Sequence, residues 1–165
     1  MPEKRTMKRA SRDKRQGKAS STQAGEFVRE EMHHIRGGKH GARSTKQAIA
    51  IGLSKARRAG VHLRPPKKGK ASAKTRRSAA RAYARGRSSA RHTPSTTRSR
   101  AISKALRRER HRAASHKALS RQAHSAARGR SAASRAAAAR KAARTKGAAG
   151  RSTAARKAAR TRAAA

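Results

Sequence analysis

The sequence predicts a mainly α protein that is largely disordered, with a small helix–loop–helix head and a long low-complexity basic tail of helical tendency. Three observations support this class. The formal net charge is +42 over 165 residues, and such a charge opposes compaction unless a polyanion balances it. Large apolar residues are scarce, with one Phe, one Tyr and no Trp, which is typical of disordered chains. Helical spacing of apolar residues is clearest between residues 23 and 63.

Charge divides the chain into a mixed head and a cationic tail. Residues 1–64 carry 17 basic and 5 acidic side chains, whereas residues 65–165 carry 31 basic and one acidic, Glu109. We therefore expect a disordered basic arm over 1–20, a helical hairpin over 21–64, a linker over 65–97 and an Ala/Arg-rich basic tail over 98–165.

The first helix of the hairpin is predicted over 23–36. Val28, Met32 and Ile35 fall at i, i+4 and i+7, which places them on one face. Gly37 and Gly38 follow and end the helix.

The second helix of the hairpin is predicted over 45–59. Ser44 and Gln47 fit a capping box at its start, and Gly60 suits its end. The expected core of the hairpin consists of the large apolar residues of both helices, namely Phe27, Val28, Met32, Ile35, Ile49 and Leu53.

The tail has a helical tendency without a packing face. Ala and Arg both favour helix, so a short helix is expected over 73–85 and a longer helical tendency over 98–128. An identical octet, AARKAART, occupies residues 138–145 and again 154–161. Because like charges repel in the free tail, we expect it to order when phosphates neutralise it.

A charge of this size indicates a nucleic acid as the partner, since neutralising phosphates releases condensed counterions. Basic residues are expected to bind duplex DNA through its phosphates, which positions a protein without specifying a sequence. The candidate contacts are Arg76, Arg77, Arg81, Arg107, Arg108, Arg128, Arg130, Arg135, Arg140, Lys141, Arg144, Arg156, Lys157 and Arg160.

Other chemistries lack the residues they need. Without Cys there are no disulfides or thiolate metal sites. His33, His34 and His40 could suggest a metal site, but the adjacent pair points to different helix faces and the only nearby acids lie in the first helix. We therefore expect a protonatable surface cluster and no metal. No set of residues suggests a catalytic site or a cofactor, and we expect the protein not to be an enzyme. No stretch approaches the length of a membrane span and no secretory signal is present, so a cytoplasmic, nucleoid-associated protein is expected.

Three alternatives remain open at this stage. One alternative to DNA as the partner is RNA, as for a ribosome-associated basic protein. A second alternative is an anionic surface such as a membrane. The hairpin is either a sequence reader of the helix-turn-helix kind or a surface for self-association through its apolar faces.

Two segments carry a resemblance to known proteins. Residues 25–32 (GEFVREEM) and 44–60 (STKQAIAIGLSKARRAG) resemble a bacterial domain family of unknown function with a KQAIAIxLSxAR core, covering about residues 20–64. The Ala-rich basic tail resembles that of histone H1-like nucleoid proteins, although it uses more Arg than Lys and little Pro. This resemblance implies a non-enzymatic protein that neutralises and bridges DNA.

Overall fold

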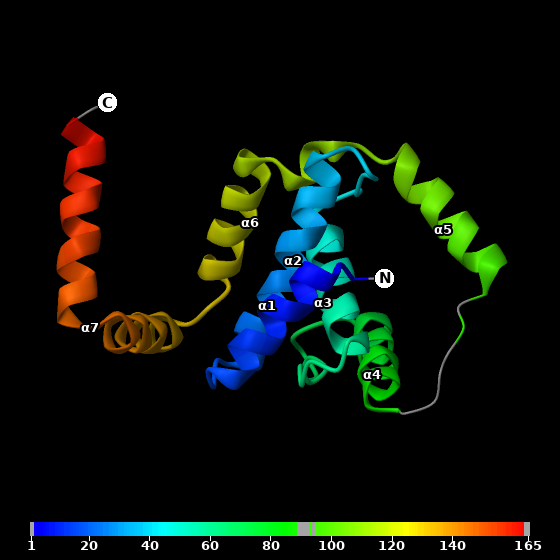
Figure 1. Cartoon of the computed structure of the whole chain (residues 1–165), viewed down its shortest axis with the longest axis horizontal. Coiled ribbons are helices and arrows are strands. Elements are labelled where there is room, and N and C mark those ends of the chain that lie inside the picture. The colour runs from blue at the N-terminus through cyan, green and yellow to red at the C-terminus, as the bar shows by residue number, and fades with distance from the viewer. Residues whose placement is uncertain (1, 89–92, 94, 164–165) are drawn as a thin grey trace. The chain divides into compact units, whose positions relative to one another are not determined.

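A computed structural model describes residues 2–88, 93 and 95–163 (Figure 1). The chain divides into two compact units, Met1–Gln122 and Ala123–Ala165, and each is described by itself. The helices in chain order are α1 (Lys4–Arg15), α2 (Ser20–Arg36), α3 (Thr45–Arg58), α4 (Ala73–Arg87), α5 (Thr96–Arg108), the 3-10 helix η1 (His111–Ala114), α6 (His116–Arg128) and α7 (Ala132–Ala163). None of the helices in these ranges is long and apolar enough to cross a membrane.

The protein is mainly α, as predicted, but the expectation that it is largely disordered is wrong. Most of the described residues are helical, and several of the helices pack on one another through small side chains. The composition argument failed because alanine and glycine let helices pack closely without large apolar side chains, and because ion pairs of the head link α1 to α2 and α2 to α3.

Serine side chains start most of these helices. Each accepts a hydrogen bond from the backbone N–H three residues later, which satisfies a donor that the helix itself leaves free. The capping residues of α3, α4, α5, α6 and α7 are Ser44, Ser72, Ser95, Ser115 and Ser131. At Ser44 the predicted capping box differs in detail, because the Gln47 side chain accepts from the N–H of Arg43.

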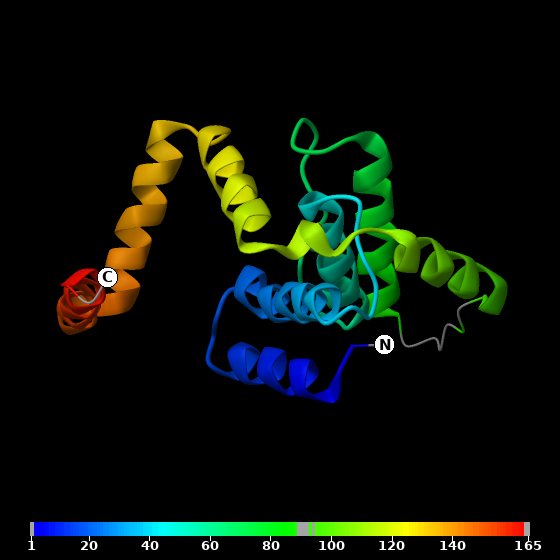
Figure 2. The ribbon, with the colours of Figure 1, turned by 90° about the horizontal axis from the view of Figure 1, so that it is seen from above.

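The expected disordered arm contains the ordered helix α1. It runs antiparallel to α2 (Figure 2), and its buried residues Thr6, Ala10 and Asp13 fall at i, i+4 and i+7. Arg9 pairs with Glu26 of α2 at 2.7 Å. The helix was not predicted because the side chains of its inward face are small or polar.

Helices α2 and α3 form the expected hairpin. Their backbones approach closely at Gly52, where an added Cβ would lie 2.7 Å from the Cα of Val28. This contact needs glycine in the middle of α3, although glycine lowers helix propensity. After α3, Val61 returns to a buried position beside Ala56.

Helix α4 packs on α3 within the segment that was expected to be a linker. Ala79 and Ala82 are its buried residues, and Gly86 lies against the backbone carbonyl of Arg57. Arg57 is itself buried, its Nε donates to the carbonyl of Leu63 at 3.0 Å, and burial lowers its pKa.

The segment between α5 and α6 completes the hairpin core. Thr45 Oγ1 donates to the Ala113 carbonyl at 2.7 Å, and Arg36 Nε donates to that of Ala114 at 2.8 Å. The N–H of Gly41 donates to the Leu106 carbonyl at 2.8 Å. These bonds hold η1 over the α2–α3 loop and bury both alanines.

Buried apolar residues form two clusters in the first unit. One contains Met32, Ile35, Ala42, Ala48, Ala113 and Ala114, with Val28, Ile49 and Leu119 packed against it. The other contains Ala10, Ala24, Phe27, Ala56 and Val61, with Leu53, Ala59 and Leu63 packed against it. The hairpin core expected from the sequence is therefore divided between two clusters, and each gains residues from outside the hairpin.

In the second unit, helix α7 buries none of its described residues. It is interrupted at Gly147, whose φ of 65° and ψ of 176° lie outside the helical region. Glycine adopts such a conformation without a steric penalty. The two octet repeats consequently lie on separate helical segments, one on each side of this kink.

Candidate nucleic-acid interface

Acidic side chains of the head are paired with basic groups inside the first unit. Besides the Arg9–Glu26 pair, Asp13 lies 2.7 Å from Lys18. Glu30 and Glu31 share Lys55, whose Nζ is 3.6 and 2.6 Å from their nearest oxygens. These pairs engage the acids of the head, and most of the other basic side chains in the described ranges are exposed.

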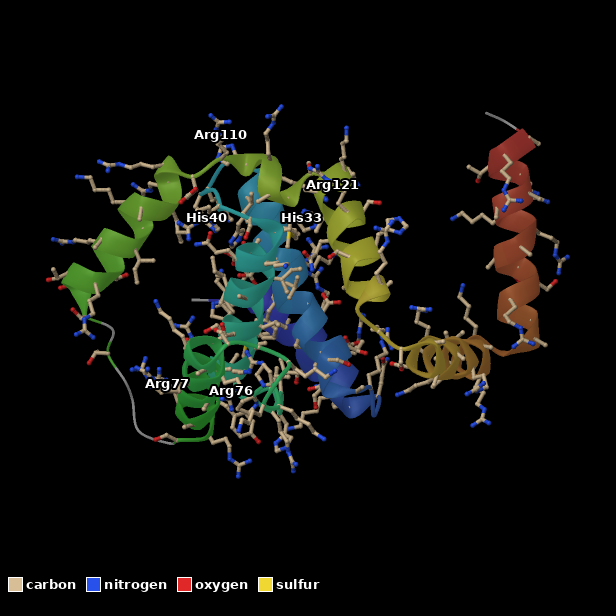
Figure 3. All side chains as sticks on the ribbon, turned by 180° about the vertical axis from the view of Figure 1, so that it is seen from behind. His33, His40, Arg76, Arg77, Arg110 and Arg121 are labelled. Carbon is tan, nitrogen blue, oxygen red and sulfur yellow. The ribbon has the colours of Figure 1, made fainter. Side chains whose placement is uncertain are left out.

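Basic side chains extend from helices throughout the described ranges (Figure 3). Of the candidate DNA contacts, Arg76 on α4 is half-buried and its Nε has no hydrogen-bond partner. The others are exposed: Arg77 and Arg81 on α4, Arg107 and Arg108 on α5, Arg128 on α6, Arg130 before α7, and Arg135, Arg140, Lys141, Arg144, Arg156, Lys157 and Arg160 on α7.

Helix α5 concentrates charge on one exposed surface. None of its residues is buried, and Arg100, Lys104, Arg107 and Arg108 line an open hollow together with two serines. Basic groups that follow one another at one-turn spacing, as Arg100, Lys104 and Arg108 do, are well placed to contact successive phosphates.

On α7 the basic residues spread around the helix instead of forming a stripe. At 100° per residue, Arg140, Lys141 and Arg144 of the first octet fall within a sector of about 100°, whereas Arg135 and Lys146 lie on the opposite side of the helix. Alanines separate them, and no acidic residue follows Glu109 in the sequence. The arrangement can contact phosphates on several sides at once.

Neither aromatic residue is free to stack on a base. Phe27 is 1% exposed and belongs to the core. The Tyr83 hydroxyl lies 2.9 Å from His62 Nδ1, and Arg87 lies over the Tyr83 ring at 5.7 Å from its centroid. Stacking platforms of the kind that bind single strands are therefore absent from the described residues.

Helix α3 is covered rather than presented as a recognition helix. It packs against α2, α4 and η1, and its exposed residues are Lys46, Ala50 and Arg58. A helix-turn-helix reader needs one exposed helix face with several side chains that reach base edges. The geometry disfavours that use of the hairpin.

A second group of charged residues lies where α2 ends, and we call it the His34–His40 cluster: Glu3, Glu31, His34, His40 and Lys55. His34 Nε2 lies 2.7 Å from Glu3 Oε1, and His40 Nε2 lies 3.0 Å from Glu31 Oε1. The two imidazole rings meet edge to face, with centroids 6.2 Å apart. The hydrogen bonds from His34 and then from Lys39 lower the pKa of Glu3 to about 2.

Sequence reasoning considered His34 and His40 together with His33 and set them aside, and it did not connect them with Glu3, Glu31 or Lys55. The spacing of Glu31 and His34, three residues apart on a helix, was a usable signal because such residues share a face. His40 was not predictable, because its position depends on how Gly37, Gly38 and Gly41 turn the chain back toward α2.

Comparison with known sequences finds a family match for the N-terminal part of the chain. No curated protein and no solved structure matches the chain. Residues 3–68 match the sequence profile of a family of unknown function (DUF6496). The predicted resemblance to a family of unknown function is thus confirmed for this region, and the matched region includes α1, α2 and α3.

Proposed function

We propose that this protein binds duplex DNA through its phosphates, with little sequence preference, and acts as a non-enzymatic, nucleoid-associated protein. It neutralises the backbone charge and bridges strands. Compaction or protection of DNA is the expected result.

The observation that carries this proposal is the separation of charge. Five of the six acids lie in the first 31 residues and all five are ion-paired within the first unit. Basic residues from α4 onward have one acid, Glu109, among them. A surface of this kind attracts polyanions at long range and gains free energy when condensed counterions are released.

The form of α7 supports binding without sequence specificity. Its cations face several directions, its alanines permit close approach to a backbone, and Gly147 lets the two octet segments take different directions. Reading bases in one groove requires a single face of matched side chains. Contacting phosphates on more than one strand does not require such a face.

Duplex DNA is favoured over single strands because the two aromatic side chains are engaged inside the first unit. An anionic membrane is disfavoured because α7 offers no large apolar side chains to insert. Interfacial helices bury Trp, Phe or Leu on one face.

A salt-titrated competition with the full chain tests the proposal. Duplex DNA of two unrelated sequences, structured RNA and anionic vesicles each compete for binding. We expect equal affinity for the two DNA sequences, weaker binding to RNA and no vesicle leakage. Equal or tighter RNA binding would move the protein to the RNA-binding class, and vesicle leakage at low protein concentration would move it to the membrane class.

A further inference from the structure

The His34–His40 cluster brings together side chains that bind metals, at a place where the sequence alone had predicted none. One ligand atom each from Glu31, His34 and His40 all lie within 4.8 Å of one another. Glu31 and His34 come from the same face of α2, and His40 comes from the loop that follows. The sequence argued against a metal because His33 and His34 face apart and because the nearby acids lie in the first helix. The fold brings one of these acids, Glu31, to within 3.0 Å of His40.

Glu31 provides a buried carboxylate that lacks properly oriented donors. The residue is 0% exposed. Lys55 and His40 lie within ion-pair distance of its two oxygens, yet neither oxygen has a hydrogen bond of acceptable geometry. Burying an ionised carboxylate without oriented partners is costly. A further positive charge beside these oxygens would therefore stabilise the Glu31 carboxylate.

His40 is oriented as metal-binding histidines are. Its Nδ1 lies 3.0 Å from the carbonyl oxygen of Gly41, which can only accept, so Nδ1 carries the proton. That leaves Nε2 facing the Glu31 carboxylate, which is also an acceptor. A cation between Nε2 and Oε1 would satisfy both atoms, and a carbonyl bound to the other ring nitrogen is the usual outer partner of a ligating histidine.

Local charge also favours a cation here despite the basic chain. Glu30 and Glu31 are both buried, at 3% and 0% exposure, and one lysine, Lys55, is near both. Lys55 would hold Oε2 of Glu31 and leave Oε1 for the metal. Glu3 Oε1 lies 2.7 Å from His34 Nε2 and 3.1 Å from Lys39 Nζ, and it is not part of the group of three ligand atoms.

We infer that Glu31, His34 and His40 form a binding site for a divalent transition metal of the Zn²⁺ class. Imidazole and carboxylate ligands suit such ions. Neighbouring ligands of tetrahedral Zn²⁺ lie about 3.3 Å apart when the bonds are about 2.0–2.1 Å. The 3.0 Å contact between His40 Nε2 and Glu31 Oε1 would therefore open by about 0.3 Å.

The test uses the full chain, freed of metal by a chelator and of nucleic acid by high salt. Co²⁺ is titrated while its visible absorption is followed, because a tetrahedral site gives intense bands, and Zn²⁺ is then added to displace it. We expect saturation at one equivalent, displacement by Zn²⁺, and a higher Tm with Zn²⁺, since a ligand that binds only the folded chain stabilises it.

His33 offers a matched control, because it is exposed on the same helix, next to His34 in the chain. In Figure 3 the labelled His33 and His40 lie apart, on different sides of the end of α2. We expect His40→Gln to weaken Co²⁺ binding by at least about tenfold, the least that loss of a supporting contact costs. His33→Gln should leave it unchanged.

Circular dichroism confirms that each variant is folded, and His34→Gln replaces His40→Gln if that variant is not. Two results would overturn the proposal: absence of a saturable one-equivalent Co²⁺ signal, or equal losses in the His33 and His40 variants. The cluster would then be a closed ion-pair network. Neither result would bear on DNA binding, which is measured separately.

Discussion

The backbone of Gly86 in α4 lies directly against the carbonyl oxygen of Arg57 in α3, with no room between them for a side chain. Glycine disfavours helix by about 1 kcal/mol relative to alanine, so its place near the end of α4 is explained by packing. The contact fixes how closely α4 approaches the hairpin and thus where the basic residues of α4 stand.

The Gly86→Ala variant should lose stability. Its Cβ would collide with a carbonyl that cannot move without disturbing α3, and overpacking of this kind costs about 1–3 kcal/mol. Urea unfolding of Gly25→Ala is the control, because a Cβ there meets nothing within 4 Å and alanine favours the helix. A Gly86 variant as stable as the Gly25 variant would mean that α4 is not packed on α3.

Gly41 allows the segment that contains η1 to approach the α2–α3 loop closely, as Gly86 allows α4 to approach α3. It packs against the backbone of Glu109, and its N–H donates to the Leu106 carbonyl at 2.8 Å. In Gly41→Ala we expect residues 106–114 to leave the α2–α3 loop. Hydrogen exchange by mass spectrometry should show faster exchange at the amides of residues 41 and 42, which bond to this segment. Unchanged exchange would contradict the proposed docking.

Phe27 is the largest fully buried side chain, and its truncation should be the most destabilising single change in the head. Phe27→Ala should cost about 3–5 kcal/mol, because it removes apolar burial and leaves a cavity. Ile102→Ala provides the comparison, since Ile102 is 60% exposed and its loss should change the midpoint of urea unfolding little. Similar midpoints for both variants would mean that the head has no fixed core.

Limited digestion with trypsin should cleave the second unit faster than the first. Exposed basic residues of α7 such as Arg140 and Lys141 lie on a helix without buried residues, so local opening there is cheap. Cleavage after Arg9, paired with Glu26, and after the buried Arg57 should be much slower. Mass spectrometry of early fragments should show an intact α1. Early cuts at Lys8 or Arg9 would indicate that α1 is not docked.

Much of the hairpin was predictable, and the reason is visible in its residues. Val28, Met32 and Ile35 have the spacing of a helix face, and Ser44 and Gly60 mark the ends of α3. Charge and composition alone also identified the basic surface, because these properties do not depend on the fold.

The elements that sequence reasoning missed are held by alanine, glycine and backbone carbonyls. Ala10, Ala113 and Ala114 look the same in the sequence as the exposed alanines of α7, so hydrophobic periodicity cannot distinguish them. Likewise, contacts such as Thr45 with Ala113, which are 68 residues apart, follow from tertiary packing. For that reason α1 was not predicted, and the packing of α4 on α3 was not predicted either, although a helix over 73–85 was expected and is present.

The most direct measurement of the central proposal is the salt dependence of DNA affinity. It compares the full chain with a variant in which Arg140, Lys141, Arg156 and Lys157 become Gln. A control places four Gln at Ala138, Ala139, Ala154 and Ala155, which retains every charge in the same two octets.

With ten phosphate contacts, the slope of log K against log salt should be near −9, from about 0.9 per contact. It should become shallower by about 0.9 for each contact that the charge variant removes, and the control should keep the original slope. A slope shallower than about −3 for the full chain, or equal slopes in the charge variant and the control, would contradict binding through the phosphates.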